Sequence, residues 1–428
     1  MLLKCPEEFS TVIIVQQELG FGTHVFGGGR IACIGRFATT SMHWESVSWP
    51  YAFVRPAIVG RGNHKEESLM LGLLKTVGLG MLVASTLAVT SLAHAEDIKL
   101  MDGVAPRPDD TRMTAAGAFK KDPPWVIGMS DFGVNANTWT VQVAHEAENA
   151  AAKDKRISKF ILLDAGFDQK KQVADIEDLI AQHVDAIIVQ PVTSTSANAS
   201  IAKAVAAGIP VILHTGRIDS DAYTTEIQGG AEHFGKVMGD WLVKTVGDNG
   251  KIWVLRGLAG HPEDTNRYNG LLESLKGTHV QIIAEEHGDW QYDKAKKLCE
   301  TLYLNNPQVD GIWSSGADMT RACVDVFKQF GTPVPPISGE GNNGYFGQWI
   351  TDGFKSISPE YSPAQGAAGV RAAVALLEGN QLYKRYVYNP DGWDQDKAKK
   401  YYRDDLTANV WWPSELPEDK LKEYYGKK

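Results

Sequence analysis

The chain has 428 residues, too many for one small hydrophobic core, and this length predicts two or three lobes. Hydrophobic residues make up 43% and charged residues 22% of it, which excludes a disordered or fibrous protein. The formal net charge is -9, and it stays negative without residues 1–95, which carry seven Lys/Arg and six Asp/Glu. An acidic protein of this kind disfavours nucleic acid as a partner, because that binding requires a basic face.

An apolar stretch of signal-peptide length begins at Met70 and contains one lysine. It ends in the small-x-small sequence AHA before Glu96, which is the pattern that signal peptidase reads. We therefore expect residues 70–95 to be a signal peptide that is cleaved after Ala95 and directs the chain to the periplasm. An uncleaved membrane anchor that begins at Thr76 is the alternative.

Residues 1–69 mix Gly, His and Trp without a sustained period, and they precede a segment type that normally begins a chain. A start codon placed too far upstream explains them most simply, so we expect a non-native or disordered leader. A genuine regulatory leader remains the alternative. No cysteine follows the expected cleavage site, so no lipid anchor is implied.

The four cysteines include no CxxC pair, which disfavours a thiolate zinc site. Cys299 and Cys323 fall on neighbouring predicted helices, where we favour two buried free thiols and keep a disulfide as the alternative. Asp391, Asp394 and Asp396 do not meet the spacing of a calcium loop. We expect neither a metal ion nor a cofactor.

Residues 96–123 are polar and contain proline, which predicts a loose segment before the first strand. From Trp125 the chain alternates between short β-branched runs and stretches with helical period; the runs are WVIGM, KFILLDAG, AIIVQPV and IPVILH. This alternation is typical of βαβ units and a parallel sheet, with four such units before about Gln228. Apolar residues at helical spacing predict core-facing helices, for example around Ile176 and Phe234.

A second set of strands follows in KIWVLRG, VQIIAEEH, GIWSSG and VPPIS. Helices are expected between them at 268–275, 293–304 and 319–330. Pro363 and Gly379 delimit one more predicted helix by their usual positions near helix starts and stops. The fold class is therefore α/β, with two doubly wound parallel-sheet lobes.

Six motifs in the same order and spacing resemble the ribose-binding type of periplasmic sugar receptor, a type I substrate-binding protein of ABC importers. They are QKKQVADIEDLI with VDAIIVQPVTSTS, AVAAGIPVILHTGR, GKVMGDWL, GLAGHPEDTNRYNG and VDGIWSSGADM. The resemblance covers about residues 124–390 and implies three crossings between the lobes, near 228–230, 358–360 and 388–391. It implies an N-terminal lobe of 124–229 plus 360–388 and a C-terminal lobe of 230–359 plus 389–428.

Ligands of open α/β sheets bind beyond the carboxyl ends of the strands, so the residues after each strand are the candidates for the site. These segments supply aromatic, amide, Arg and carboxylate groups, which suit the apolar faces and hydroxyls of a sugar. By resemblance, Arg217 and Arg267 stand where the family has arginines that hold the ligand, and Trp139 and Trp290 where it has stacking aromatics. Salt bridges for the arginines and core packing for the tryptophans are the alternatives.

The acids depart from the family pattern. Glu340 and Glu360 stand where ribose receptors have Asp and Gln, and the usual Asn-Asp pair becomes Gly316-Ala317 followed by Asp318, which caps the next helix in the alternative interpretation. This difference favours a small sugar or polyol other than ribose. Asp131 and Gln190 are weaker candidates. The expected ligand-binding residues are Asn137, Trp139, Arg217, Arg267, Trp290, Asp318, Glu340 and Glu360.

The resemblance implies a monomeric, non-enzymatic solute receptor whose partners are a small sugar or polyol and the membrane permease of an ABC transporter. A glycosidase that uses Glu340 and Glu360 as paired acids is the alternative, as is a sugar receptor for chemotaxis or signalling. A sugar-responsive repressor is excluded because an apolar export segment replaces the DNA-reading helices. Trp411 and Trp412 near the C-terminus contact either a lobe or the transporter, and we favour packing on a lobe.

Overall fold

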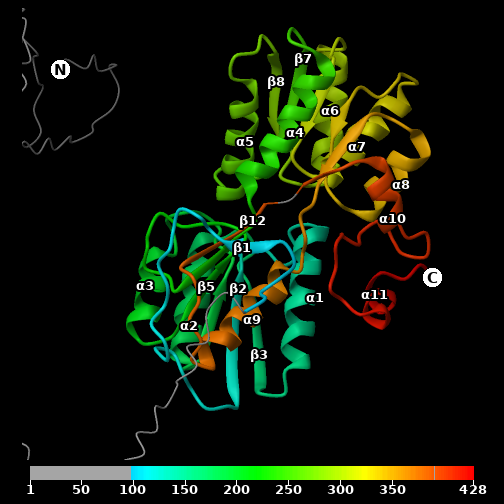
Figure 1. Cartoon of the computed structure of the whole chain (residues 1–428). Helices are drawn as coiled ribbons and strands as arrows, with labels where there is room; N and C mark the ends of the chain where they lie inside the picture. The colour runs from blue at the N-terminus through cyan, green and yellow to red at the C-terminus, as the bar shows by residue number, and fades with distance from the viewer. Residues whose placement is uncertain (1–97, 390) are drawn as a thin grey trace, which may run out of the picture. The chain divides into compact units, whose positions relative to one another are not determined.

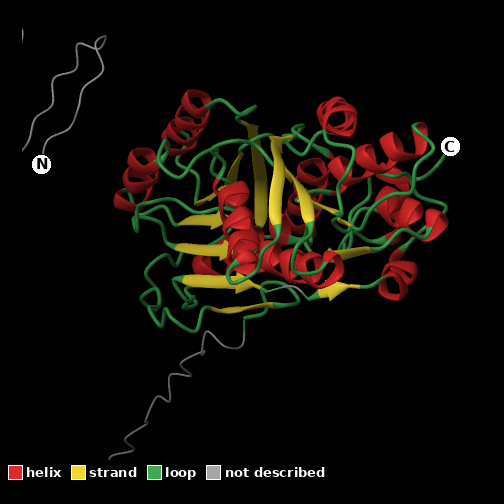
Figure 2. Cartoon of the chain, turned by 90° about the horizontal axis from the view of Figure 1, so that it is seen from above, coloured by secondary structure: helices red, strands yellow, loops and turns green. Residues whose placement is uncertain are grey.

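The computed structural model describes residues 98–389 and 391–428, so the expected leader, signal peptide and cleavage site lie outside the described residues. These residues form two α/β lobes (Figure 1). Helices lie on both sides of the strands (Figure 2). No helix in the described ranges combines the length and the apolar character that crossing a membrane requires. The predicted fold class is confirmed.

The N-terminal lobe is built on a seven-stranded sheet of order β1-β12-β6-β5-β4-β2-β3. Its neighbouring strands run parallel except for the antiparallel pair β1 and β12. Its strands are β1 (Val104–Pro106), β2 (Trp125–Asp131), β3 (Ile157–Asp164), β4 (Ala186–Val189), β5 (Val211–His214), β6 (Thr225–Gln228) and β12 (Arg385–Tyr388). Its helices are α1 (Thr138–Lys153), α2 (Gln169–Ala181), α3 (Asn198–Ala206) and α9 (Gln365–Leu377).

The C-terminal lobe is built on a six-stranded sheet of order β13-β11-β10-β9-β7-β8, in which β11 and β13 are antiparallel. Its strands are β7 (Lys251–Arg256), β8 (Gln281–His287), β9 (Gly311–Ser314), β10 (Ile337–Ser338), β11 (Ser356–Pro359) and β13 (Gly392–Trp393). The helices that follow its strands or precede them are α4 (Ala231–Val246), α5 (Pro262–Leu275), α6 (Tyr292–Asn305), α7 (Ala317–Gln329), α8 (Asn343–Asp352), α10 (Gln395–Tyr401) and α11 (Glu418–Tyr425).

The chain passes from one sheet to the other at three places: between β6 and α4, between β11 and α9, and between β12 and β13. Parallel strands in both lobes end on the side that faces the other lobe, so the loops after the strands meet between the lobes (Figure 1). This arrangement brings residues far apart in the sequence into one site.

Two details of the sequence prediction were wrong. The segment before the first long strand is not loose, because Leu100 and Met101 are buried and β1 pairs with β12. No helix follows β5, so the N-terminal lobe has three βα units before Gln228 instead of four. The connection from β5 to β6 is short and rich in turn-forming residues, which leads the chain directly into another strand.

Two glycines allow α4 and α5 to pack closely. A Cβ atom on Gly235 would overlap the carbonyl oxygen of Arg267, and one on Gly270 would overlap the carbonyl oxygen of Glu232. Bulkier residues would force the helices apart. The close packing fixes the backbone of α5, and therefore the position from which the Arg267 side chain extends.

A disulfide joins Cys299 on α6 to Cys323 on α7, so our preference for two free thiols was wrong. The two helices lie side by side, both cysteines are fully buried, and their Cα atoms are 5.3 Å apart. The sequence predicts helices α6 and α7, but it does not show which of their faces pack together. An intact disulfide fits an oxidising compartment such as the periplasm.

We predict that residues 96–428, purified without a reductant, show no reactive thiol after denaturation. The bond closes a loop with a sequence separation of 24, so replacing both cysteines with alanine should lower the free energy of unfolding by about 3 kcal/mol. Urea denaturation of the two proteins measures this difference. Two reactive thiols in the denatured, non-reduced protein would contradict the assignment.

Candidate ligand-binding site

A cavity lies between the lobes, at the carboxyl ends of the strands. Its walls come from the loops after strands of both sheets, from the first turns of helices, and from the C-terminal segment. The lining residues are Phe132, Asn137, Trp139, Thr140, Gln190, Thr215, His261, Glu263, Arg267, Trp290, Gly316, Ala317, Asp318, Glu340, Tyr361 and Trp411.

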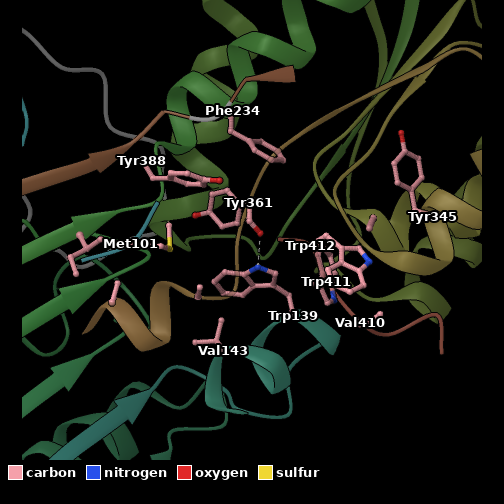
Figure 3. Packing of buried hydrophobic residues seen from close by; sticks show 14 of the residues in the cluster. Met101, Trp139, Val143, Phe234, Tyr345, Tyr361, Tyr388, Val410, Trp411 and Trp412 are labelled. Atoms are coloured by element: carbon pink, nitrogen blue, oxygen red, sulfur yellow. Dashed lines mark hydrogen bonds between the residues drawn. The ribbon is translucent and has the colours of Figure 1, made fainter. Parts of the chain in front are cut away.

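Asn137 and Trp139 reach the cavity because α1 begins there. The side-chain oxygen of Asn137 accepts hydrogen bonds from the backbone N–H groups of Trp139 and Thr140, each at 3.0 Å, and so caps the helix. The Trp139 indole N–H donates to the carbonyl oxygen of Tyr361 at 3.1 Å (Figure 3). Tyr361 lies in the crossing between β11 and α9. The Trp139 ring is thereby fixed against the Tyr361 ring, with centroids 5.5 Å apart.

Trp290 forms an aromatic wall on the C-terminal lobe. Asp289 and Trp290 both have positive φ, which makes the sharp turn that precedes α6. The Trp290 indole N–H donates to the carbonyl oxygen of Ser315 at 3.1 Å, and its ring lies perpendicular to that of His261 with centroids 5.3 Å apart. The sequence candidates Trp139 and Trp290 thus both line the cavity.

Arg267 is the buried cation of the cavity, and its side chain is 4% exposed. Its guanidinium donates to Glu340 at 3.0 Å and to the carbonyl oxygen of Ser315 at 2.6 Å, and its Nε atom lies 3.6 Å from a Glu263 oxygen. The Tyr361 hydroxyl donates a hydrogen bond to the Glu263 carboxylate. One arginine is therefore shared by two buried carboxylates.

Burial raises the pKa of Glu263 and of Glu340, against the opposing attraction of Arg267. Burial also raises the pKa of the Tyr361 hydroxyl, which the negative charge of Glu263 raises further. Burial lowers the pKa of Arg267, but the surrounding negative groups, Glu340 foremost, more than reverse this effect. The guanidinium therefore stays charged, and Tyr361 remains a hydrogen-bond donor.

Asp318 connects the two lobes and does not cap α7, so the capping alternative was wrong. The N-cap position of α7 is Gly316, and no side chain makes the cap hydrogen bond. Asp318 accepts hydrogen bonds from Asn342 at 2.9 Å, from Arg321 at 3.0 Å and from the Thr138 hydroxyl at 2.9 Å. Because Thr138 begins α1 in the other lobe, this last bond joins the two lobes.

The family described as periplasmic binding protein domain matches residues 132–381, more than half of the chain. The chain belongs to this family.

Among curated relatives, the ribose import binding protein of Bacillus subtilis is 24% identical over 266 residues, which cover 61% of this chain and 84% of that protein. The galactofuranose-binding protein of Escherichia coli is 28% identical over 296 residues, which cover 65% of this chain and 92% of that protein. The xylitol-binding protein of Mycolicibacterium smegmatis is 28% identical over 232 residues, which cover 52% of this chain and 65% of that protein.

Solved structures agree with this family assignment. The arabinose-transporter binding component of a Shewanella species, bound to L-arabinofuranose, has a TM-score of 0.60 and 25% identity over 65% of this chain and 94% of that chain. A solute-binding protein of Bacillus halodurans with bound myo-inositol has a TM-score of 0.60 and 20% identity over 66% of this chain and 98% of that chain, which shows the shared fold. The family consists of solute-binding proteins.

In this periplasmic binding protein, Arg217 and Glu360 do not line the cavity. After β5, Thr215 and Gly216 have positive φ; Thr215 lines the cavity, whereas Arg217 lines an adjoining space together with Pro262 and Asn266. Glu360 instead accepts hydrogen bonds from the Tyr388 hydroxyl and, at 3.0 Å, from the Trp393 indole. Its neighbour Tyr361 faces the cavity, because successive residues of an extended segment point to opposite sides.

Sequence reasoning also missed His261, which is 1% exposed and caps α5 by accepting from the Glu263 backbone N–H at 3.1 Å. Burial, together with the charge of Arg267, lowers the pKa of His261 to about 3, so the ring is neutral. Because its Nδ1 atom accepts a hydrogen bond, its Nε2 atom carries the hydrogen. The sequence His-Pro at a helix start was the available signal.

Trp411 was missed as a cavity residue as well. The preference for packing fits its burial, since Trp411 is 3% and Trp412 7% exposed. However, Trp411 also forms part of the cavity wall. No strand-end rule points to it, because it belongs to the C-terminal segment.

Two buried polar atoms of cavity-lining residues have neither a hydrogen-bond partner nor an ion-pair partner within the described chain: His261 Nε2 and Gln190 Oε1. Buried polar groups are normally paired, because leaving one unpaired costs about 1–3 kcal/mol. One of these atoms is a donor and the other is an acceptor. Together they match a ligand group that both accepts and donates hydrogen bonds.

Asp131, at the end of β2, is fully buried and does not line the cavity. Burial raises its pKa to about 7, although a hydrogen bond from the Gly133 backbone N–H opposes the change and the nearby Asp164 adds to it. The folded state therefore binds the Asp131 proton more tightly than the unfolded state does. This stabilisation is complete below about pH 4 and is lost as the pH rises through about 7.

We predict that Asp131→Asn removes part of the pH dependence of stability. Between pH 5 and 8 the wild type should lose a few kcal/mol of unfolding free energy relative to the variant, because the buried carboxyl ionises. Urea denaturation across this pH range measures both proteins. Parallel stability curves would contradict the raised pKa.

Proposed function

We propose that this chain is the solute-binding protein of an ABC importer, that it holds a small sugar or polyol in the cavity between its lobes, and that it delivers the ligand to the membrane permease. Membership of the periplasmic binding protein family supports this proposal. The relatives named for ribose, xylitol and galactofuranose support the ligand class.

The observation that carries the proposal is the combination of unpaired polar atoms with aromatic walls. A sugar hydroxyl accepts hydrogen bonds and donates one, so hydroxyls of the ligand can accept from His261 Nε2 and donate to Gln190 Oε1. The C–H faces of the same ligand pack on Trp139 and Trp290. A neutral polyhydroxyl compound uses both features at once.

The proposed ligand contacts follow from the lining of the cavity. Of the residues expected from the sequence, we retain six and leave out Arg217 and Glu360, which lie elsewhere. The retained residues are Asn137, Trp139, Arg267, Trp290, Asp318 and Glu340. Gln190, His261 and Tyr361 complete the proposed set.

The shared arginine also restricts the ligand's charge. Glu263, Glu340 and Asp318 bring more negative than positive groups to the cavity, with Arg267 as its lining cation. An anionic ligand such as a sugar phosphate or a sugar acid would face these carboxylates without a free counter-charge. We therefore propose an uncharged sugar or polyol.

We further propose that the mature protein begins after Ala95, acts in the periplasm as a monomer and catalyses no reaction. A glycosidase would need two acids across the sugar. Glu360, one of the two acids considered for that role, is held at the crossing by Tyr388 and Trp393, away from the cavity that Glu340 lines. No observation on the described residues favours the enzyme over the receptor.

Titration calorimetry of residues 96–428 with a sugar and polyol panel tests the proposal. The panel contains D-ribose, L-arabinose, D-xylose, D-allose, D-galactose, xylitol and myo-inositol. We expect at least one compound to bind, and Trp290→Ala to weaken that binding at least about tenfold because the variant loses an aromatic wall. Trp241→Ala is the matched control, since Trp241 is half-buried on α4 and does not line the cavity.

Failure of the wild type to bind any member of the panel would contradict the proposed ligand class. Equal losses in Trp290→Ala and Trp241→Ala would remove Trp290 from the site.

A further inference from the structure

The C-terminal segment beyond the family match extends over both lobes. The match ends at residue 381, whereas β13, α10 and α11 follow it. The segment 410–415 lies between α10 and α11 (Figure 1), and its residue Trp411 lines the cavity. Its contacts with each lobe are distinct.

On the C-terminal lobe, the segment pairs like a short strand with the loop that follows Glu340. The Asn343 backbone N–H donates to the carbonyl oxygen of Val410 at 2.8 Å, and the Trp412 N–H donates to that of Gly341 at 2.8 Å. Asn342 and Trp411 form the bridge between these two bonds. The segment is therefore held in register with a cavity-lining loop.

On the N-terminal lobe, two fully buried side chains of α1 bind the same segment. The Gln142 carboxamide accepts from the Trp411 backbone N–H at 2.7 Å and donates to the Trp411 carbonyl oxygen at 3.1 Å. The Glu146 carboxylate accepts from the Ser414 hydroxyl at 2.6 Å and from the Glu415 N–H at 3.0 Å. Both backbone groups of Trp411 are thus satisfied by one side chain of the opposite lobe.

The Trp411 side chain continues this connection into the cavity wall. Its indole N–H donates to the Thr138 hydroxyl at 2.9 Å, and that hydroxyl donates to Asp318 at 2.9 Å. The indole is buried and lines the cavity, near Trp139 in the close view (Figure 3). The adjacent Trp412 is also buried but does not line the cavity.

We infer that Trp411 is a specificity-determining residue of the sugar site, an inference that rests on the proposed function. Its indole limits the space for the ligand beside α1 and adds an aromatic face to those of Trp139 and Trp290. Gln142 fixes the backbone that carries this indole, and Thr138 fixes the ring. Gln142 and Thr138 belong to the N-terminal lobe, whereas Asn342, which pairs with Trp411, belongs to the C-terminal lobe. The part of the cavity wall that Trp411 forms is therefore complete when the two lobes are closed.

Calorimetry with the sugar and polyol panel tests this inference on residues 96–428. Trp411→Ala should weaken the compound that the wild type binds best at least about tenfold and change the order of affinities across the panel. Trp411→Phe, which keeps a smaller ring without the N–H group, should show the same changes to a lesser extent. Trp412→Ala and Trp412→Phe are the matched controls, and melting temperatures without sugar report folding of all four variants.

Unchanged affinities and an unchanged order in both Trp411 variants would overturn the inference while leaving the proposed function intact. Equal losses in the Trp412 variants would also overturn it, because the effect would then come from packing of the segment. A wild type that binds no compound of the panel would overturn the proposed function and the inference with it.

Discussion

The arrangement of the cavity depends on one buried cation, the guanidinium of Arg267, shared between Glu263 and Glu340. Removing an ion from water costs several kcal/mol unless partners replace its hydration. The partners here come from three parts of the chain: helix α5, the loop after β10, and the crossing that carries Tyr361. The Phe234 and Tyr361 rings also face the guanidinium, at 4.0 and 4.4 Å. The Arg267 side chain therefore connects the cavity, the crossing that carries Tyr361 and the close packing of α4 on α5.

This coupling explains why the cavity suits an uncharged ligand that is rich in hydroxyls. The carboxylates already hold the arginine, and the neutral His261 ring offers a donor without adding charge. Polar atoms on both lobes remain for the ligand, Gln190 on one lobe and His261 on the other. A compound that bonds to both lobes stabilises the closed form over the open one, since only the closed form offers all of its contacts. The Thr138–Asp318 hydrogen bond and the Trp411 wall add direct contacts to that closed form.

The sequence predicted the features that follow from strand ends. Trp139, Arg267, Trp290 and Glu340 follow predicted strands, and the carboxyl-end rule places them at the cavity. Glu360 was chosen where Tyr361 lines the cavity, because sequence patterns do not fix which of two successive extended residues faces inward. Arg217 follows a positive-φ turn at Thr215 and lines a neighbouring space between the lobes. The disulfide was not expected because the sequence does not show on which faces α6 and α7 meet. Trp411 depends on contacts between α1 and a segment about 270 positions later, which no local period encodes.

We propose that the lobes close around the ligand, and small-angle X-ray scattering of residues 96–428 tests this closure. The measurement compares the free protein with the protein saturated by the panel compound that calorimetry shows to bind best. We expect a smaller radius of gyration with the compound, because rotation about the three crossings brings the lobes together. Binding that leaves the radius of gyration unchanged would contradict it.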